Sequence, residues 1–299
     1  MVELVRRRPP DQTLAWVARS VGPKAQVRSW RRLTGGITSS VHLVSVNTPN
    51  EPRRLILKRW VEGDLEQSRG WVEHEAEVLR ALERTGLASP RLVACSLGAE
   101  TDGAPALLMT RLPGRVWLAP SDPRDWVKQM ATALATIHNL QLPVEIPVTP
   151  HPEREVRLPR DACSPQLWQA AKDLLSGPIP VEDTFIHGDY QHFNLLWTRR
   201  RLSGIIDWTW AGRGHPDRDV GHCRLNLAVL FSADWAQEFS AAYQAEAGRT
   251  TDAWWDVFEI CLYSDAWTGF IPVQVGGRVD VDTAGMTDRV EALLAAALG

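Results

Sequence analysis

The chain has 299 residues, of which 44% are hydrophobic and 23% are charged. These values are ordinary for a globular protein and exclude collagen-like, coiled-coil and disordered chains, and the formal net charge of −3 argues against a general nucleic-acid-binding protein. The length is enough for one large domain or two modest ones with a sizeable core. The unusual feature is the 14 tryptophans, which we expect to divide between core packing and the wall of a binding site.

The N-terminus and the cysteines bear on the cellular compartment. The first residues lack the apolar stretch of a signal peptide, and no run approaches the roughly 18 apolar residues of a membrane span. The four cysteines are scattered, without the paired spacing of a zinc site or of a disulfide scaffold. We therefore expect a cytoplasmic protein with no membrane partner.

The first part of the chain predicts a small antiparallel sheet. Apolar alternation and turn residues indicate strands at residues 27–33, 40–46, 54–60, 92–97 and 106–111. Helices are expected at 11–21 and at 71–84, where apolar residues recur along one helical stripe. Residues 1–112 therefore predict a sheet of about five strands with one helix inserted.

After Pro113-Gly114 the pattern becomes mainly helical. Helices are predicted at residues 125–140, 164–176, 218–231, 234–247, 252–263 and 287–298, with short strands between 185 and 206. The proline-rich stretch 143–160 predicts an irregular connection. The predicted fold class is α+β, with a small lobe at 1–112, a hinge at about 110–114 and a larger, mainly helical lobe at 113–299.

Three oxygen-bearing side chains follow short strands in the second lobe. Asp189 is followed five residues later by Asn194, and thirteen residues after that by Asp207. Phosphoryl transfer needs one carboxylate that orients an attacking hydroxyl and two oxygen donors that hold Mg²⁺ on the phosphates. The spacing therefore predicts a phosphoryl-transfer site.

The same stretch resembles the aminoglycoside phosphotransferase family, whose members are small-molecule kinases of the bilobal protein-kinase-like fold. The resemblance rests on His187-Gly188-Asp189 with Asn194, on Ile205-Ile206-Asp207-Trp208, and on the stretch from Gly214 to Asp219. It implies that Asp189 is the catalytic acid–base residue and that Asn194 and Asp207 bind the metal. It also implies that His187 and Asp219 brace the loop.

The resemblance extends to nucleotide binding in the first lobe. The segment 33–41 is similar to the family's phosphate-covering hairpin, which implies roles for Gly35, Gly36 and Ser39. Lys58 ends an apolar strand, where a cation is costly to bury unless it is paired. The resemblance assigns it to the phosphates of ATP, with a helix glutamate as partner. Glu75 aligns best with that glutamate and Glu77 is the alternate.

The last strand of the first lobe resembles the hinge that holds the adenine through backbone groups. The implied contacts are the Thr110 carbonyl and the Leu112 N–H, with Met109 behind the base. ATP is the expected nucleotide, and GTP stays an alternative. Two residues after Asp189 the family often has His, where this chain has Gln191 and then His192, so the residue that reaches the γ-phosphate stays open. Because no long activation segment follows Asp207, we expect no protein substrate.

The acceptor is predicted from charge. Residues 1–112 carry a net charge of +5 and residues 217–299 a net charge of −8, which indicates a basic nucleotide lobe and an acidic acceptor region. Asp256 and Glu259 lie among aromatic residues that include Trp255, an arrangement suited to a cationic amine. The alternative is a solvated acidic helix face over an aromatic core.

The expected activity is therefore ATP- and Mg²⁺-dependent phosphorylation of a hydroxyl on a small, amine-bearing molecule such as an aminoglycoside, with a role in antibiotic resistance. The alternatives are a metabolic kinase for a sugar, amino alcohol or macrolide, and a nucleotide-binding pseudoenzyme.

Overall fold

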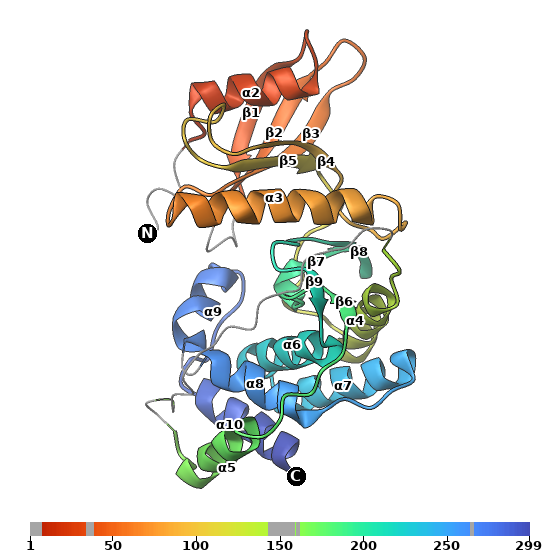
Figure 1. The fold of residues 1–299 in the computed structure, drawn as a ribbon, viewed down its shortest axis with the longest axis vertical. Coiled ribbons are helices and arrows are strands. Elements are labelled where there is room, and N and C mark those ends of the chain that lie inside the picture. The colour runs from red at the N-terminus through yellow and green to blue at the C-terminus, as the bar shows by residue number, and fades with distance from the viewer. Residues whose placement is uncertain (1–7, 34–38, 143–158, 160–161, 264–265) are drawn as a thin grey trace. The chain divides into compact units, whose positions relative to one another are not determined.

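The computed structural model describes residues 8–33, 39–142, 159, 162–263 and 266–299 (Figure 1). The chain forms two compact units. The first unit comprises Met1–Pro113 together with Gly204–Thr209, and the second comprises Gly114–Ser203 together with Trp210–Gly299. The division after Pro113 lies one residue beyond the predicted one, and residues 204–209 join the first unit from a distant part of the chain.

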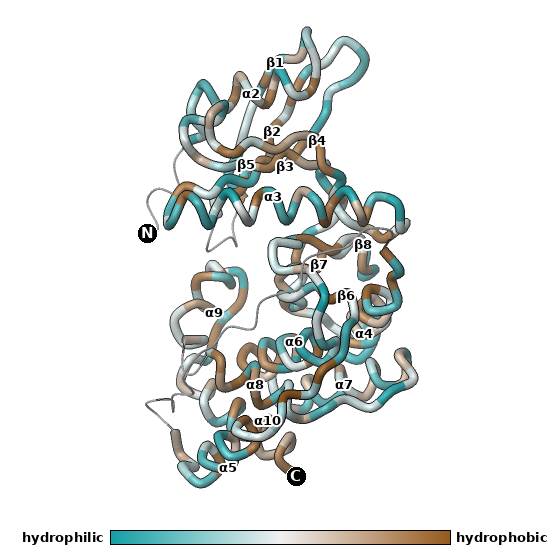
Figure 2. Tube along the Cα trace, viewed as in Figure 1, coloured by the Kyte–Doolittle hydropathy of each residue, from teal (hydrophilic) through white to brown (hydrophobic). Residues whose placement is uncertain are grey.

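The first unit is built on a five-stranded antiparallel sheet of order β1-β2-β3-β5-β4. Its elements are α2 (Asp11–Val21), β1 (Gln26–Arg32), β2 (Ser40–Asn47), β3 (Arg53–Arg59), α3 (Leu65–Leu82), β4 (Leu92–Ser96) and β5 (Ala106–Thr110). Hydrophobic stretches run along β3, β4 and β5 (Figure 2). The predicted strands are all present, each within about two residues of its expected ends, which is the usual uncertainty of such boundaries.

The two faces of β3 pack against different helices. Because side chains alternate along a strand, Leu55 and Leu57 point to one face and Lys58 to the other. The leucines join a buried core with Trp16 and Val17 of α2, whereas Lys58 contacts α3. The helices α2 and α3 therefore cover opposite faces of the sheet (Figure 1).

Helix α3 begins six residues earlier than predicted. The Asp64 side chain caps it by accepting a hydrogen bond of 2.9 Å from the backbone N–H of Gln67. An aspartate in this position satisfies a backbone donor that the first turn leaves unpaired. The early start therefore depends on a cap rather than on the apolar stripe from which the helix was predicted.

The second unit is mainly helical. Its helices are α4 (Pro123–His138), α5 (Pro165–Leu175), α6 (Pro216–Leu230), α7 (Ala233–Ala247), α8 (Ala253–Tyr263), α9 (Trp267–Val275) and α10 (Met286–Leu298). Short strands β6 (Thr184–Ile186), β7 (Leu195–Thr198), β8 (Arg201–Ile205) and β9 (Gly212–Gly214) pair as β6-β9 and β7-β8. The sequence did not predict β9, whose pairing is long-range, or α9, which contains Pro272. Most of the predicted irregular stretch 143–160 lies outside the described residues. The α+β class is confirmed.

Helix α6 lies at the centre of the second unit (Figure 1), and every residue from Pro216 to Val229 is buried. A helix that is hydrophobic all round is a usual core helix, but α6 also buries polar and charged side chains. These are Asp217, Arg218, Asp219, His222, Arg224 and Asn226. Their charges therefore have to be balanced inside the protein.

Most of the tryptophans are core residues. Nine are buried, namely Trp16, Trp60, Trp126, Trp168, Trp197, Trp208, Trp254, Trp255 and Trp267. Trp30 and Trp210 are exposed, at 36% and 43%. Among the helices in the described ranges, none combines the length and hydropathy that crossing a membrane would require.

Gly221 lets α6 approach α8 closely. A Cβ atom at this position would lie 2.7 Å from the carbonyl oxygen of Trp255. Gly221→Ala should therefore lower the free energy of unfolding by about 1–3 kcal/mol, because the α8 backbone has to move. Gly269→Ala in α9 is the matched control, since no atom lies within 4 Å of a Cβ there and helix propensity favours alanine by up to about 1 kcal/mol. Thermal or urea unfolding compares the two, and a loss at Gly269 equal to that at Gly221 would contradict the packing argument.

Candidate active site

The first group of predicted site residues surrounds Lys58 in the first unit. Its Nζ atom lies 2.8 Å from Oε2 of Glu75, 2.7 Å from Oδ1 of Asp207 and 2.7 Å from Oγ1 of Thr209. The ammonium also lies 4.8 Å from the centre of the Trp60 ring. Lys58 and Glu75 are buried, whereas the Asp207 side chain is 39% exposed. Lys58 is thus a buried cation between two carboxylates, one of which is open to solvent.

These carboxylates determine the charge of Lys58. Burial, the largest single influence, would lower the pKa of the ammonium, but Asp207 and Glu75 together outweigh it. The pKa of Lys58 therefore lies above its ordinary value. Lys58 remains a cation at all physiological pH values.

The structure distinguishes the two glutamates that the sequence left open. Glu75 contacts Lys58, and Glu77 lies exposed on the same helix. Thr209 was not among the predicted site residues, and its hydroxyl lies 2.9 Å from both Glu75 and Asp207. Its position two residues after Asp207 was the only signal. Asp207 itself has a φ of +67°, which is rare for a residue other than glycine and is typical of functional sites.

The second group surrounds Asp189 in the second unit. The Asn194 amide nitrogen donates to the backbone oxygen and to Oδ2 of Asp189, both at 2.8 Å. Gln191 donates to Oδ1 at 2.7 Å, and Nε2 of His222 lies 2.9 Å from the same oxygen. With its side chain 24% exposed, Asp189 is held firmly and still reaches solvent.

Buried contacts fix the loop that carries Asp189. The Asp219 carboxylate accepts hydrogen bonds from the backbone N–H groups of His187 at 2.7 Å and Gly188 at 2.8 Å, and it pairs with Nε2 of His138 at 3.2 Å. Burial would raise the pKa of Asp219, but the contacts with His138 and His187 outweigh it and the pKa is lowered. Asp219 thus anchors the loop backbone, and Nδ1 of His187 accepts a hydrogen bond of 3.3 Å from the Asp189 N–H. These contacts agree with the bracing expected of both residues, which stays a prediction.

Gly188 is required by the backbone. Its φ is +77°, and a Cβ atom would lie 2.1 Å from the carbonyl oxygen of Trp210. No other residue fits such a conformation and such a close approach. The glycine of the motif therefore permits the turn that presents Asp189.

The structure places Gln191 and His192 differently. Gln191 contacts the Asp189 carboxylate. His192 is buried, with its ring centre 4.2 Å from that of Phe193 and 5.5 Å from that of Phe231. Burial, aided by the positive charges of Arg278 and His222, lowers the pKa of His192 to about 3. His192 is therefore a neutral core residue in this structure.

His222 was also not among the predicted site residues. It lies one helical turn after Asp219 in α6, and residues three apart share a helix face. The spacing of three residues from Asp219 was the one sign in the sequence that His222 could lie near the site. The sequence could not show that this face of α6 meets the Asp189 loop.

Residues 29–255 match the phosphotransferase enzyme family. The chain belongs to this family. The resemblance inferred from the motifs is thereby confirmed, and the predicted enzyme class, a phosphotransferase, is the class of the family.

A curated relative is a probable acyl-CoA dehydrogenase, IBR3, of Arabidopsis thaliana, which is 25% identical over 232 residues. The match covers 67% of this chain but 28% of that protein, so the chain spans less than a third of the relative's length.

Three solved structures show the fold. The aminoglycoside-3′-phosphotransferase of type VIII has a TM-score of 0.57 at 17% identity, covering 84% of this chain and 99% of that chain. The choline kinase LicA from Streptococcus pneumoniae has a TM-score of 0.57 at 17% identity, covering 91% and 94%. The amicoumacin kinase hAmiN, in complex with AMP-PNP, Ca²⁺ and Ami, has a TM-score of 0.60 at 14% identity, covering 95% and 93%. The predicted protein-kinase-like fold is confirmed.

The remaining residues predicted to bind the nucleotide belong to the first unit. Ser39 is buried before β2, and Gly35 and Gly36 lie outside the described residues. Met109 is buried in β5, opposite Ile56 of β3. Thr110 ends β5, and Leu112 is half-buried against Gly204, which is part of the same unit.

The residues predicted to bind the acceptor are inside the second unit. Asp256 is ion-paired with the buried Arg224, and Glu259 pairs with Nε of Arg218 at 3.2 Å. Burial, opposed by Arg224, raises the pKa of Asp256 to about 6. Trp255 is 1% exposed and stacks on His215. The carboxylates thus face arginines rather than solvent, which argues against direct contact with a cationic acceptor.

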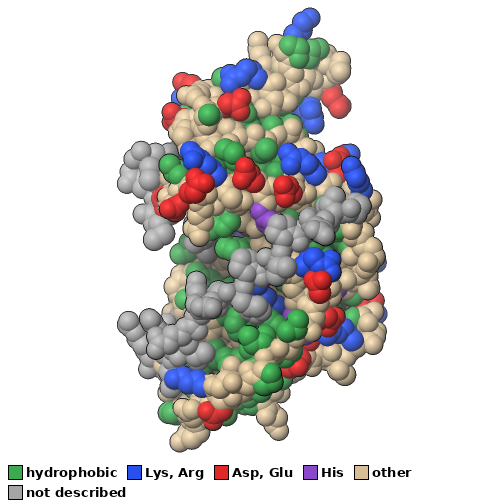
Figure 3. All heavy atoms as spheres, viewed as in Figure 1, with side chains coloured by type: hydrophobic (Ala, Val, Ile, Leu, Met, Phe, Trp, Pro, Cys, Tyr) green, Lys and Arg blue, Asp and Glu red, His purple; other side chains and the backbone are tan. Residues whose placement is uncertain are grey.

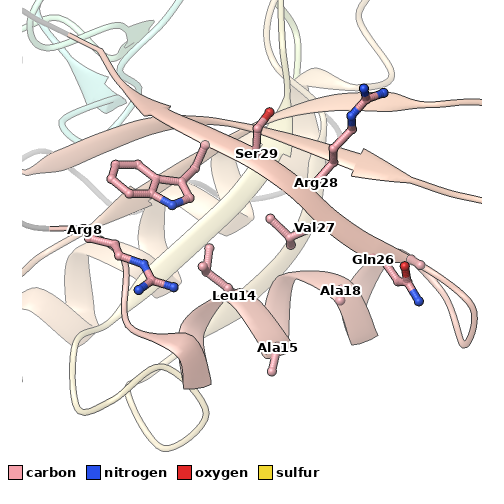
Figure 4. Close-up of a pocket in the computed structure, with 10 residues that line it drawn as sticks. Arg8, Leu14, Ala15, Ala18, Gln26, Val27, Arg28 and Ser29 are labelled. Carbon is pink, nitrogen blue, oxygen red and sulfur yellow. The ribbon is translucent and has the colours of Figure 1, made fainter.

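A shallow groove of about 410 Å³ lies between α2 and β1, where Arg8, Leu14 and Arg28 are among the lining residues (Figure 4). None of the predicted site residues lines it.

The Lys58 cluster yields a stability prediction. Glu75→Gln should lower the free energy of unfolding by about 1–3 kcal/mol, because the buried ammonium loses one of its carboxylates. Glu77→Gln is the matched control, since surface substitutions usually change stability by less than about 0.5 kcal/mol. Urea unfolding of both variants measures the difference, and equal losses would show that Glu75 is not the partner on which Lys58 depends.

Proposed function

We propose that the protein transfers the γ-phosphate of ATP, with Mg²⁺, to a hydroxyl of a small polar molecule. The observation that carries the proposal is the environment of Asp189. Asn194 and Gln191 orient its carboxylate through hydrogen bonds, and the carboxylate remains partly exposed. The loop that carries Asp189 is held by backbone hydrogen bonds to the buried Asp219. Family membership supports the reaction class.

Lys58 is the proposed phosphate-binding cation. Its ammonium is held in place by Glu75, so little conformational freedom is lost when it meets an anion. We assign the adenine to Met109, Thr110 and Leu112, and the phosphates also to the hairpin residues Gly35, Gly36 and Ser39. The complex of amicoumacin kinase with AMP-PNP supports ATP as the nucleotide.

Asp207 and Asn194 are the proposed metal ligands. Asp207 offers a carboxylate that is 39% exposed. Asn194 uses its amide nitrogen on Asp189, so the group that it offers a metal is its carbonyl oxygen. Both are hard oxygen donors of the kind that Mg²⁺ binds in small number alongside phosphates and water. Bound Mg²⁺ would neutralise charge on the phosphates.

Asp189 is the proposed catalytic residue. Asp189 accepts a hydrogen bond from the acceptor hydroxyl and thereby directs the hydroxyl oxygen at the γ-phosphorus. As the new O–P bond forms and the bond between phosphorus and the β,γ-bridging oxygen breaks, the hydroxyl proton passes to Asp189. ADP leaves with the electron pair of the broken bond.

The acceptor is the open part of the proposal. The aminoglycoside-like, amine-bearing acceptor predicted from charge depended on Asp256, Glu259 and Trp255, which are buried and internally paired or stacked. On the face in Figure 3, acidic and basic side chains lie intermixed. These observations favour the alternative, a metabolic kinase for a hydroxylated acceptor such as a sugar, an amino alcohol or a macrolide, over an enzyme for a polycation.

Thermal-shift screening with ATP and Mg²⁺ separates these acceptor classes. A sugar, amino-alcohol, macrolide or aminoglycoside that stabilises the protein is then tested for transfer of the γ-phosphate. If expression made an aminoglycoside-sensitive host resistant, the result would instead support the aminoglycoside-like acceptor predicted from charge. Nucleotide binding without turnover on any acceptor, or with water, would show a pseudoenzyme instead.

Substitutions of Asp189 and of Asp207 should impair different steps of the reaction. Asp189→Asn should lower turnover by roughly 10²- to 10⁴-fold, the contribution of a positioned acid–base group, while Mg²⁺–ATP binding persists. Asp207→Ala should lose Mg²⁺-dependent nucleotide binding, because a metal ligand is removed. Calorimetric titration with Mg²⁺–ATP and a phosphate-transfer assay measure both effects. Turnover by the Asp189 variant near the wild-type rate would refute the proposed role.

A further inference from the structure

His222 lies between two carboxylates in the interior of the second unit. Its Nε2 atom is 2.9 Å from Oδ1 of Asp189, and its Nδ1 atom is 3.0 Å from Oε2 of Glu259. The ring is 6% exposed. Glu259 in turn pairs with Arg218 of the same helix as His222. Acidic and basic side chains therefore alternate along a row, in the order Asp189, His222, Glu259 and Arg218.

The geometry determines the protonation of the ring. An ionised carboxylate only accepts hydrogen bonds, so an imidazole that bonds to two of them must donate from both nitrogens and carry a positive charge. Burial by itself would lower the pKa of His222, but the bonds to Asp189 and Glu259 outweigh it and raise the pKa to about 10. Asn226 of α6 and Tyr263 of α8 also face the ring.

The contact distributes the hydrogen bonds of Asp189 unevenly. Oδ1 accepts hydrogen bonds from His222 and Gln191, whereas Oδ2 accepts one from Asn194. A carboxylate oxygen has about two lone-pair sites. Oδ1 is therefore filled by the protein, and Oδ2 is the oxygen with capacity for one more donor.

We infer that His222 is a positioning residue of the phosphotransfer site, which holds Asp189 so that Oδ2 meets the acceptor hydroxyl. This role rests on the proposed function. The Glu259–His222 pair orients the carboxylate from behind and stabilises its anionic form. Asp189 then acts chiefly by orienting the hydroxyl, which suits a loose transition state in which phosphoryl transfer needs little prior proton removal. Glu259 contributes through His222, in place of the acceptor contact predicted from the sequence.

The first test is a titration that does not depend on activity. The protein is labelled with ¹³C at histidine Cε1, and the His222 signal is identified by its loss in His222→Gln. The wild-type signal should stay that of an imidazolium from pH 6 to pH 9. In Glu259→Gln the measured pKa should fall toward the ordinary value of about 6.5. A neutral His222 at pH 7 in the wild-type protein would overturn the inference.

The second test measures turnover with water as acceptor, as hydrolysis of Mg²⁺–ATP by the full chain. His222→Leu should lower kcat by roughly 10- to 100-fold, the loss found when partners that orient a functional side chain are removed, with KM for ATP unchanged. His222→Gln, whose amide can still donate to Asp189, should recover part of that loss. His215→Asn is the matched control. His215 is a buried histidine at the start of the same helix whose Nδ1 accepts the Asp217 N–H, a capping role that asparagine can fill.

The outcomes are separable. An unaltered kcat in His222→Leu, beside an active wild-type protein, would refute the role of His222 alone. A loss of the same size in the His215 control would show a general effect of substitution in α6 and would also refute it. No hydrolysis by the wild-type protein and no transfer to any acceptor would refute the proposed function, and the positioning role with it. Thermal unfolding of each variant verifies that it is folded.

Discussion

The cost of burying charge is the constraint on which this structure depends. An ion removed from water is tolerated only when opposite charges and hydrogen bonds surround it. Helix α6 carries acids, arginines and a histidine through the centre of the second unit, and Asp256 and Glu259 of α8 are the counterions of the arginines and the histidine. Because Gly221 allows the two backbones to approach, these ion pairs can close. The packing of α6 on α8 is thus also the electrostatic foundation of the Asp189 loop.

The same constraint governs the first unit on a smaller scale. Lys58 follows the apolar residues Leu55–Leu57 of β3 and is neutralised by Glu75 from α3 and by Asp207 from a distant segment. That segment, residues 204–209, belongs to the first unit although its neighbours on both sides belong to the second. A buried cation on a strand therefore recruits the residue that the family motif assigns to the metal. In both units, the side chains proposed to act on phosphate are the ends of buried ionic networks.

Local patterns were enough for much of the fold and for part of the site. The strands of the sheet and the helices around α6 follow from short-range periodicity. Asp189, Asn194 and Asp207 were singled out by their spacing, and Lys58 by its place after an apolar strand segment, while their roles stay predictions. The helix after β3 started early because a capping contact at Asp64 outweighs the stripe pattern. The assignment of Asp256 and Glu259 to an acceptor was built on their clustering with aromatic residues. Such clustering cannot distinguish a solvent-facing acid from one that faces Arg224 or Arg218.

Residue order therefore accounted for the α+β class, the family and the residues of the phosphotransfer motif, because these depend on neighbours a few positions apart. The partners of the buried charges were decided by the tertiary structure. Lys58 and Asp207 are 149 positions apart, and His222 and Glu259 are 37 apart. No periodicity or spacing encodes which side chains meet across such separations. The packing of helices and strands brings them together, and the energetic cost of an unpaired buried charge then makes each partner specific.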